Sequence, residues 1–285
     1  MAEIDELFGK EKSTEFKPYD KDEWIKQKQE NRSAAFELID KAADSLTDIS
    51  KLNSFLDVQS RFDRYSVSNA LLVAEQKPDA TRLCDSKQWQ KIGAFIKKGE
   101  KGITILEPGE EFKRDDGSTG VSFNAKKVFD ISQTNAKAKN YPEKNHDFKK
   151  LVKALIKTSP VSVNISNNLQ SDVKAMYSPG KKSILIRQGM DGADIFRALS
   201  YEIAMARTDN GSFNRENAET HAYCVSYIVC KRNNVEPIKP EVNMKPFENK
   251  DTKSIREELS KVRDEANNID SVIEKALKPK DKGAR

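Results

Sequence analysis

The stretch Trp89-Gln-Lys-Ile-Gly-Ala-Phe-Ile-Lys-Lys-Gly-Glu-Lys-Gly-Ile-Thr-Ile-Leu106 combines a helical pattern, a basic turn and a strand pattern. The apolar residues of its first half recur at three- and four-residue spacing, which predicts one face of a helix: Trp89, Ile92, Phe95 and Ile96. Gly99 and Gly102 predict the end of that helix, and the apolar run 103–106 is typical of a short buried strand.

A basic turn, Lys97-Lys98-Gly99-Glu100-Lys101-Gly102, lies between the predicted helix and the strand. From Lys87 to Lys101 there are five lysines and one glutamate, which leaves a local excess of four positive charges. Glycine lets the backbone approach a ligand closely, and a lysine ammonium meets phosphate as a mobile point charge. The turn therefore indicates a contact with a nucleic-acid backbone or, as the stretch alone favours, a solvated connection.

The composition predicts a globular protein with a highly charged surface, because 36% of the 285 residues are apolar and 33% are charged. The formal net charge of +5 is too small to indicate nucleic-acid binding without a suitable arrangement of charge. Three scattered cysteines exclude a disulfide framework and a CxxC metal site, so we expect them to be reduced and buried. The chain has neither a long apolar run nor a signal-peptide pattern, and we expect a cytoplasmic protein without membrane contact.

The patterns predict an α+β fold with several segments. Residues 1–32 read as a polar N-terminal arm, and residues 33–134 as helices followed by a small antiparallel sheet. Residues 135–146 form a basic linker by composition, and 147–245 predict strands, a hairpin about Pro179-Gly180 and two helices. Residues 246–285 hold an amphipathic helix, 253–277, and a basic tail, and this helix is expected to pack on the second domain.

An ordered set of residues in the first domain resembles a known family. Tyr65, Asn69 and Gln76 are followed by Trp89, the lysine turn, and Val128-Phe129-Asp130-Ile131-Ser132-Gln133-Thr134. This order is similar to the N-terminal domain of ArdC-type antirestriction proteins and LtrC-like products, which plasmids and conjugative elements carry. The resemblance implies single-stranded DNA as partner, an antirestriction role on a mobile element, and host restriction or conjugation proteins as further partners.

Single-strand binding needs cations along a groove and aromatic faces on which bases stack. The predicted contact residues are Arg64, Tyr65, Asn69, Trp89, Lys97, Lys98, Lys101, Lys126 and Phe129. The helical spacing of Trp89 favours burial over stacking, and Tyr65 and Asn69, four residues apart on a helix, are also placed to bond each other or the backbone. Phe123 is a further aromatic residue among these cations.

The second domain resembles a zincin-like metallopeptidase, in which a helix carries H-E-x-x-H and binds zinc. Tyr201 and Met205 stand where the two histidines are expected, Glu202 keeps the general-base position, and Glu219 matches the third ligand. A phenol and a thioether do not replace two imidazoles as zinc ligands, so we expect no metal, no cofactor and no catalysis.

Several alternatives stay open at this point. Glu202 and Glu219 either share a partly buried pocket, with the Tyr201 hydroxyl or Arg207 as partner, or are ordinary surface acids. A metallopeptidase with a non-standard site built from Glu202, Glu219 and His221 is one alternative function. A protein-interaction module of the conjugation machinery, formed by the second domain and the 253–277 helix, is another. The oligomeric state stays undetermined.

Overall fold

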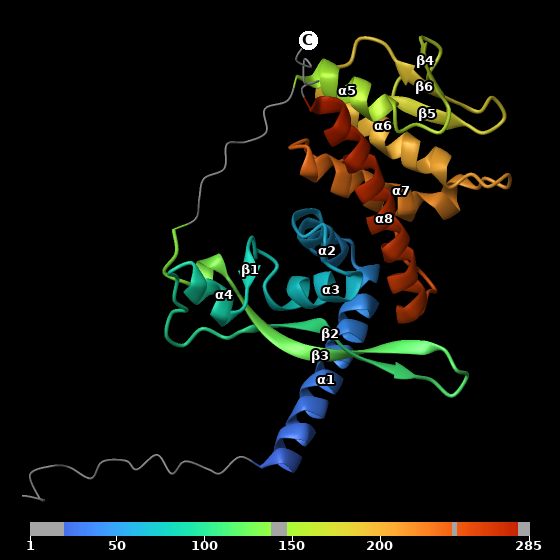
Figure 1. The fold of residues 1–285 in the computed structure, drawn as a ribbon. Helices are drawn as coiled ribbons and strands as arrows, with labels where there is room; N and C mark the ends of the chain where they lie inside the picture. Colours follow the sequence, from blue (N-terminus) through green and yellow to red (C-terminus); the bar gives the residue numbers. More distant parts are fainter. Residues whose placement is uncertain (1–19, 138–146, 241–243, 279–285) are drawn as a thin grey trace, which may run out of the picture.

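The structure is a computed structural model that describes residues 20–137, 147–240 and 244–278 (Figure 1). The predicted basic tail and most of the predicted arm and linker lie outside these residues. Helix α1 spans Lys21–Asp44 and begins where the Asp20 side chain accepts hydrogen bonds from the amides of Asp22 and Glu23. The helix was expected to begin only at Ser33. Its first half has no buried residue, so no apolar stripe reveals it in the sequence.

The helices that follow α1 begin at residues whose side chains cap them. Helix α2, Ile49–Arg61, is capped by Asp48, and helix α3, Val67–Gln76, is capped by Ser66. Helix α4 is shorter than predicted, because it spans only Ser86–Lys91 and is followed by Gly93 at φ +75°. The residues that were expected to extend its apolar face are outside the helix, and two of them are exposed: Ile92 and Phe95.

The first sheet has the strand order β1-β3-β2. Strands β2, Ile103–Lys113, and β3, Thr119–Asp130, form the long hairpin predicted from the turn residues 115–118. Strand β1, Leu83–Cys84, pairs antiparallel with the end of β3. The loop between α4 and β2 therefore lies at the end of the sheet where β3 finishes.

The second unit is a small mixed sheet with helices. It contains α5, Phe148–Ile156, and strands in the order β4-β6-β5, in which β6 is parallel to β4 and antiparallel to β5. The strands are β4, Ser162–Ser166, β5, Ala175–Ser178, and β6, Ser183–Arg187. Helices α6, Gly192–Arg207, α7, Arg215–Arg232, and α8, Thr252–Leu277, follow. The predicted α+β class is confirmed.

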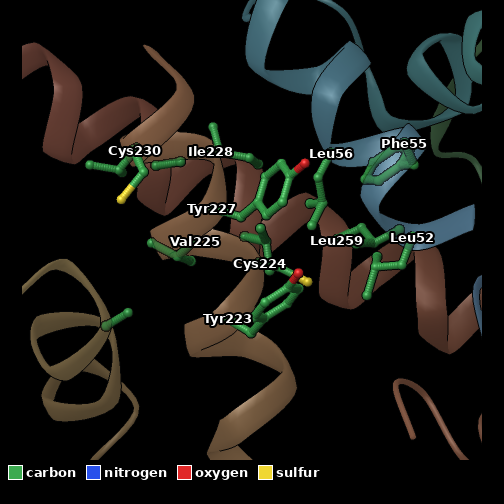
Figure 2. Close-up of a cluster of buried hydrophobic side chains, with 14 of the residues drawn as sticks. Leu52, Phe55, Leu56, Tyr223, Cys224, Val225, Tyr227, Ile228, Cys230 and Leu259 are labelled. Carbon is green, nitrogen blue, oxygen red and sulfur yellow. The ribbon is translucent and has the colours of Figure 1, made fainter. Parts of the chain in front are cut away.

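A shared hydrophobic core joins the two units. Figure 2 shows Leu52, Phe55 and Leu56 of α2 beside α7, with Leu259 of α8 between them. The Tyr223 hydroxyl of α7 donates to Asn53 Oδ1 at 2.7 Å, which adds a polar contact beside the core. Helix α8 packs along α7 and α5 and also contacts α1 and α3 (Figure 1). Among the described residues, no helix has the length and apolar character needed to cross a membrane.

Candidate nucleic-acid interface and candidate metal centre

Two amide side chains of α3 hold the outer edge of β2. Asn69 Nδ2 donates to the Leu106 carbonyl at 2.9 Å, and Asn69 Oδ1 accepts from the Leu106 amide at 2.7 Å. Gln76, two helical turns later, makes the same pair of bonds with Thr104, at 2.9 and 2.8 Å. The amide of Asn69 thus has a structural role in holding β2, and its contact with DNA stays a prediction.

Two polar residues of the segment 128–134, Asp130 and Gln133, hold the basic turn. Gln133 Nε2 donates to the Lys101 carbonyl at 2.8 Å and to Glu100 Oε2 at 2.9 Å, and Gln133 Oε1 accepts from the Asp130 amide. Burial alone would raise the pKa of Asp130, but the amides of Arg82, Ser132 and Thr81, together with the Ser132 side chain, hold it below its usual value. The turn is therefore fixed to the end of β3.

The loop before the turn presents an exposed aromatic ring. Phe95 is 60% exposed, although its backbone is held on both sides. Its amide donates to Asn135 Oδ1 at 2.8 Å, and its carbonyl accepts from the Asn135 amide at 3.0 Å. The next residue, Ile96, forms an antiparallel bridge with Thr134. The sequence prediction assigned Phe95 to a helix face and so missed a ring that stands in solvent on a fixed backbone.

The three lysines of the turn follow Phe95 closely in the sequence and are exposed. The Lys97 amide donates to the Gln133 carbonyl, and its ammonium donates to the Ser132 carbonyl at 2.9 Å. Lys98 and Lys101 are also exposed, and Gly99 between them adopts φ +89°, a value that favours glycine. Phe95 and these lysines form what we call the basic loop: Phe95, Lys97, Lys98 and Lys101.

Three other predicted contacts have structural roles. Trp89 is fully buried, and its Nε1 donates to the Phe129 carbonyl at 2.9 Å, so stacking of Trp89 on a base is excluded in this conformation. Phe129 is half-buried and packs in the same small cluster. The Lys126 ammonium lies 3.0 Å from both Asp85 Oδ2 and Glu107 Oε2, so its charge is already neutralised.

Arg64 and Tyr65 are not part of the basic loop. Tyr65 is half-buried and stacks on Phe62 with ring centroids 5.1 Å apart, and burial raises its pKa. Arg64 is exposed and lines a cavity of about 670 Å³ whose other walls come from α7 and α8. Of the predicted contact residues, the basic loop therefore contains only the three turn lysines.

In the second unit, three of the four residues predicted for the degenerate metal site line one cavity. Tyr201 and Met205 of α6 and Glu219 of α7 border a space of about 430 Å³. Glu219 is half-buried at the wall of this cavity, whereas Glu202 lines a second cavity that also borders Tyr201. The cavity is also lined by a residue that the sequence prediction missed, Arg215, at the first position of α7.

Glu202 is buried beside this cavity and is bound by protein groups. Its Oε2 accepts from the Tyr177 amide at 2.6 Å and from Arg215 Nη1 at 3.2 Å, and its Oε1 accepts from Arg215 Nη2. Burial opposes the charge of Arg215, but the Glu202 carboxylate raises the pKa of Arg215 above its usual value, and Tyr201 and Glu219 add to this effect. The expected partner Arg207 instead donates to the Thr158 carbonyl at 2.7 Å.

His221 belongs to a different contact. Its Nδ1 lies 2.7 Å from Glu258 Oε1 and its Nε2 lies 2.9 Å from Glu265 Oε2, both on α8. The alternative metal site of Glu202, Glu219 and His221 is therefore not assembled. Across the described ranges, no group of three or more His, Cys, Asp or Glu residues is placed to hold a metal ion.

Comparison with known proteins gives one family domain and one fold. Residues 43–153 match the model of the N-terminal domain of anti-restriction factor ArdC. The crystal structure of the Mn(II)-bound antirestriction ArdC protein from the R388 plasmid has a TM-score of 0.58 and 15% identity, covering 85% of this chain and 99% of that one. The metal-free structure of the same protein has a TM-score of 0.52 and 16% identity, covering 74% of this chain and 85% of that one. No curated protein matches this chain.

The Mn(II)-bound relative raises the question of whether a metal ion fits here. The residues of this cavity do not suit one, because a phenol and a thioether stand at Tyr201 and Met205, and divalent manganese and zinc prefer imidazole and carboxylate. A guanidinium is also bound to Glu202. The donor set therefore fits an internal ion pair and not a metal centre.

Proposed function

Because residues 43–153 form an ArdC-type N-terminal domain within an ArdC-like fold, we propose that this chain binds single-stranded DNA and serves an antirestriction role on a mobile element. The resemblance predicted from the sequence is confirmed at the level of the domain and the fold. Cytoplasmic action, and contacts with host restriction or conjugation proteins, are parts of the same proposal.

The observation that carries the proposal is the basic loop. Its backbone is fixed by Gln133 and Asn135, while Phe95 and the three lysines stay in solvent. A single strand is bound by cations along its phosphates and by rings on which its bases stack, the latter worth about 1–3 kcal/mol per base. A fixed loop of this composition supplies both without the entropic cost of ordering a flexible segment.

The charge of the β2–β3 hairpin also supports the basic loop as the site of DNA binding. The outer half of the β2–β3 hairpin also exposes an aromatic ring, Phe112, which is 47% exposed. The Arg114 guanidinium lies 5.9 Å from the centre of that ring, but residues 110–116 carry four acidic residues against Lys113 and Arg114, so this part of the hairpin has a net negative charge. An anionic strand is repelled there and attracted by the lysine turn, so the turn is the better site for DNA.

The second unit is proposed to be catalytically inactive. Without a metal, no water is activated for peptide hydrolysis, and Glu202 is already held by Arg215 and the Tyr177 amide. The zincin-like unit then contributes a stable scaffold through the core that it shares with α2. The proposal predicts no peptidase activity with added Zn²⁺ or Mn²⁺.

The test is fluorescence anisotropy of a labelled single strand of about 20 bases. The wild type is compared with Lys97→Ala/Lys98→Ala/Lys101→Ala over a range of salt concentrations. Binding of the wild type should weaken with salt, by about 0.7 in log affinity per log salt for each phosphate neutralised. The triple variant should bind less tightly, with a salt slope smaller by about 2.

A charge-matched control distinguishes an effect of the basic loop on DNA binding from an effect of the overall net charge. Lys149→Ala/Lys153→Ala/Lys157→Ala removes three exposed lysines in and after α5 and changes the net charge by the same amount. This control should bind like the wild type. Equal losses in both triple variants would mean that only overall charge matters, and absence of binding by the wild type would refute the proposal.

A further inference from the structure

The guanidinium of Arg215 lies beside the acidic residues at the cavity of the second unit. It makes a two-point contact with both carboxylate oxygens of Glu202, whose side chain is only 5% exposed. Arg215 also lines the cavity beside Tyr201, Met205 and Glu219; Lys239 lines it too, but Arg215 is the cation that is paired with Glu202. Guanidinium is planar and presents parallel donors, which matches a carboxylate better than any other protein cation does.

The position of Arg215 is fixed by the chain before it. Asn214 caps α7, and its side chain accepts from the Asn217 amide, which sets Arg215 at the first helical position. The preceding loop is anchored to strand β5 by two contacts of Tyr177. The Tyr177 ring meets Phe213 edge-on at 5.2 Å, and its hydroxyl donates to Asp209 at 2.5 Å.

The same Tyr177 also holds Glu202. Its amide donates to Glu202 Oε2 at 2.6 Å, so one residue of the edge strand positions both the carboxylate and the loop that delivers the cation. Lys182 adds to this anchor through its ion pair with Asp209 at 2.7 Å. Carboxylate, loop and guanidinium are thus parts of one built arrangement and not a chance surface pair.

We propose that Arg215 is the built-in cation of this cavity: its guanidinium takes the charge-balancing role that a metal ion has on this fold and closes the site to divalent metal. The proposal concerns the proposed inactive second unit and is independent of DNA binding. The positive charge of Arg215 acts on Glu219, the predicted third ligand, as well as on Glu202. A divalent ion at Glu219 is therefore opposed by a cation that is covalently attached and always present at high effective concentration.

The proposal makes a prediction that differs from the one made by loss of the histidines alone. If loss of the imidazoles were the whole reason for the loss of metal, restoring them would restore a site, since His at positions 201 and 205 with Glu219 supplies the usual ligands. If Arg215 also blocks the site, restoring two histidines leaves a fixed positive charge beside the ligands. Metal binding then requires removal of Arg215 as well.

The test measures Mn²⁺ and Zn²⁺ binding by isothermal titration calorimetry on the full chain. The variants are Tyr201→His/Met205→His, and the same pair with Arg215→Ala. The double variant should bind metal no better than the wild type. The triple variant should bind at one equivalent and at least about tenfold more tightly than the double variant, with a metal-dependent rise in Tm.

Two further variants keep the result interpretable. Tyr201→His/Met205→His/Arg215→Lys retains the positive charge and should stay weak, whereas adding Arg207→Ala to the histidine pair removes an arginine that does not contact Glu202 and should change nothing. Circular dichroism of each variant establishes that it is folded. Where the alanine triple variant is unfolded, Arg215→Gln replaces it, because glutamine is neutral and still hydrogen-bonds Glu202.

Tight, stoichiometric metal binding by the histidine double variant with Arg215 intact would overturn the proposal. So would a lysine variant that binds as tightly as the alanine variant, because charge would then be irrelevant. Absence of metal binding in the folded triple variants would also overturn it, since the cavity would then lack a metal geometry for reasons other than Arg215. None of these outcomes bears on single-strand binding, which is measured separately.

Discussion

Asn69 on α3 binds both backbone groups of Leu106, with its Nδ2 2.9 Å from the carbonyl oxygen and its Oδ1 2.7 Å from the amide nitrogen. An asparagine side chain thereby takes the place of a neighbouring strand at this point of β2. Because Leu106 is buried, loss of the Asn69 amide leaves backbone groups without partners in a place that water reaches poorly.

We therefore expect Asn69→Leu to lower the free energy of unfolding by about 1–3 kcal/mol. Urea unfolding followed by circular dichroism measures the effect, and Glu75→Ala, an exposed change on the same helix, is the control. The folded variant should bind single-stranded DNA like the wild type. Normal stability with lost DNA binding would instead support Asn69 as a DNA contact.

Substitution of Phe95 and of Trp89 should affect different properties, DNA affinity for Phe95 and stability for Trp89. Phe95→Ala removes an exposed ring, so DNA affinity should fall by about 1–3 kcal/mol while stability stays nearly unchanged. Trp89→Ala empties a buried site and should lower stability by about 3–5 kcal/mol.

Anisotropy titration and urea unfolding are needed for both variants. Phe112→Ala is the matched control, because this phenylalanine is comparably exposed but lies on the acidic hairpin. Its DNA affinity should equal that of the wild type. A loss at Phe112 with no loss at Phe95 would move the interface to the hairpin.

The opening stretch also shows how far the sequence was informative. The α+β order was predicted correctly, and the helices begin at side-chain caps whose chemistry is local: Asp48, Ser66 and Asp85. The end of α4 was predicted wrongly. Gly93 at φ +75° ends the helix, although the helical spacing of apolar residues continues in the sequence through Ile96. The same interruption turns Phe95 outward, so a residue assigned to a helix face became the candidate stacking ring.

Arg215 could not be identified from its neighbours in the sequence. Arg207 lies on the same helix as Glu202 and was the natural candidate, yet a five-residue offset turns it to another side of α6. Arg215 reaches Glu202 only because the intervening loop folds back and is anchored by Tyr177. Such pairing depends on tertiary structure, and no local pattern records it.

His221 should make stability depend on pH through its two contacts with α8. Burial alone would lower the pKa of His221, yet Glu258 and Glu265 raise it from 6.5 to about 9. Its stabilising contribution is therefore complete below pH 6.5 and is lost as the pH rises through about 9. The bond to His221, against burial, holds the pKa of Glu258 at about 2. The stabilising contribution of Glu258 is therefore complete above about pH 4.5 and is lost as the pH falls through about 2.

His221→Gln should consequently cost roughly 3 kcal/mol of unfolding free energy near pH 6, on the scale of 1.4 kcal/mol per unit of pKa difference. Urea unfolding at about pH 6 and about pH 9.5 tests this expectation. The difference between variant and wild type should shrink at the higher pH. Glu257→Gln, an exposed change on α8, is the control, and a difference that does not change with pH would contradict the assignment.

The three cysteines should differ in their reactivity. Cys224 and Cys230 are fully buried, and burial raises the pKa of the Cys230 thiol to about 11 and that of Cys224 further. Cys84 is half-buried at the sheet edge. A thiol-reactive dye at neutral pH should label one thiol first, and Cys84→Ser should abolish that phase. Rapid labelling of all three in the folded protein would contradict the shared core.

The position of α8 has a consequence for synthesis on the ribosome. Its first turns contact α1, through Arg256 and Asp40 at 3.3 Å, and its Leu259 lies against residues of α2. The amino-terminal helices are made first, but their last covering element emerges more than two hundred residues later, after both sheets. Helices α3 and α7 pack on α2 earlier, but the contact of Leu259 with this core is missing during that interval, so a nascent chain halted before α8 is expected to depend on chaperones.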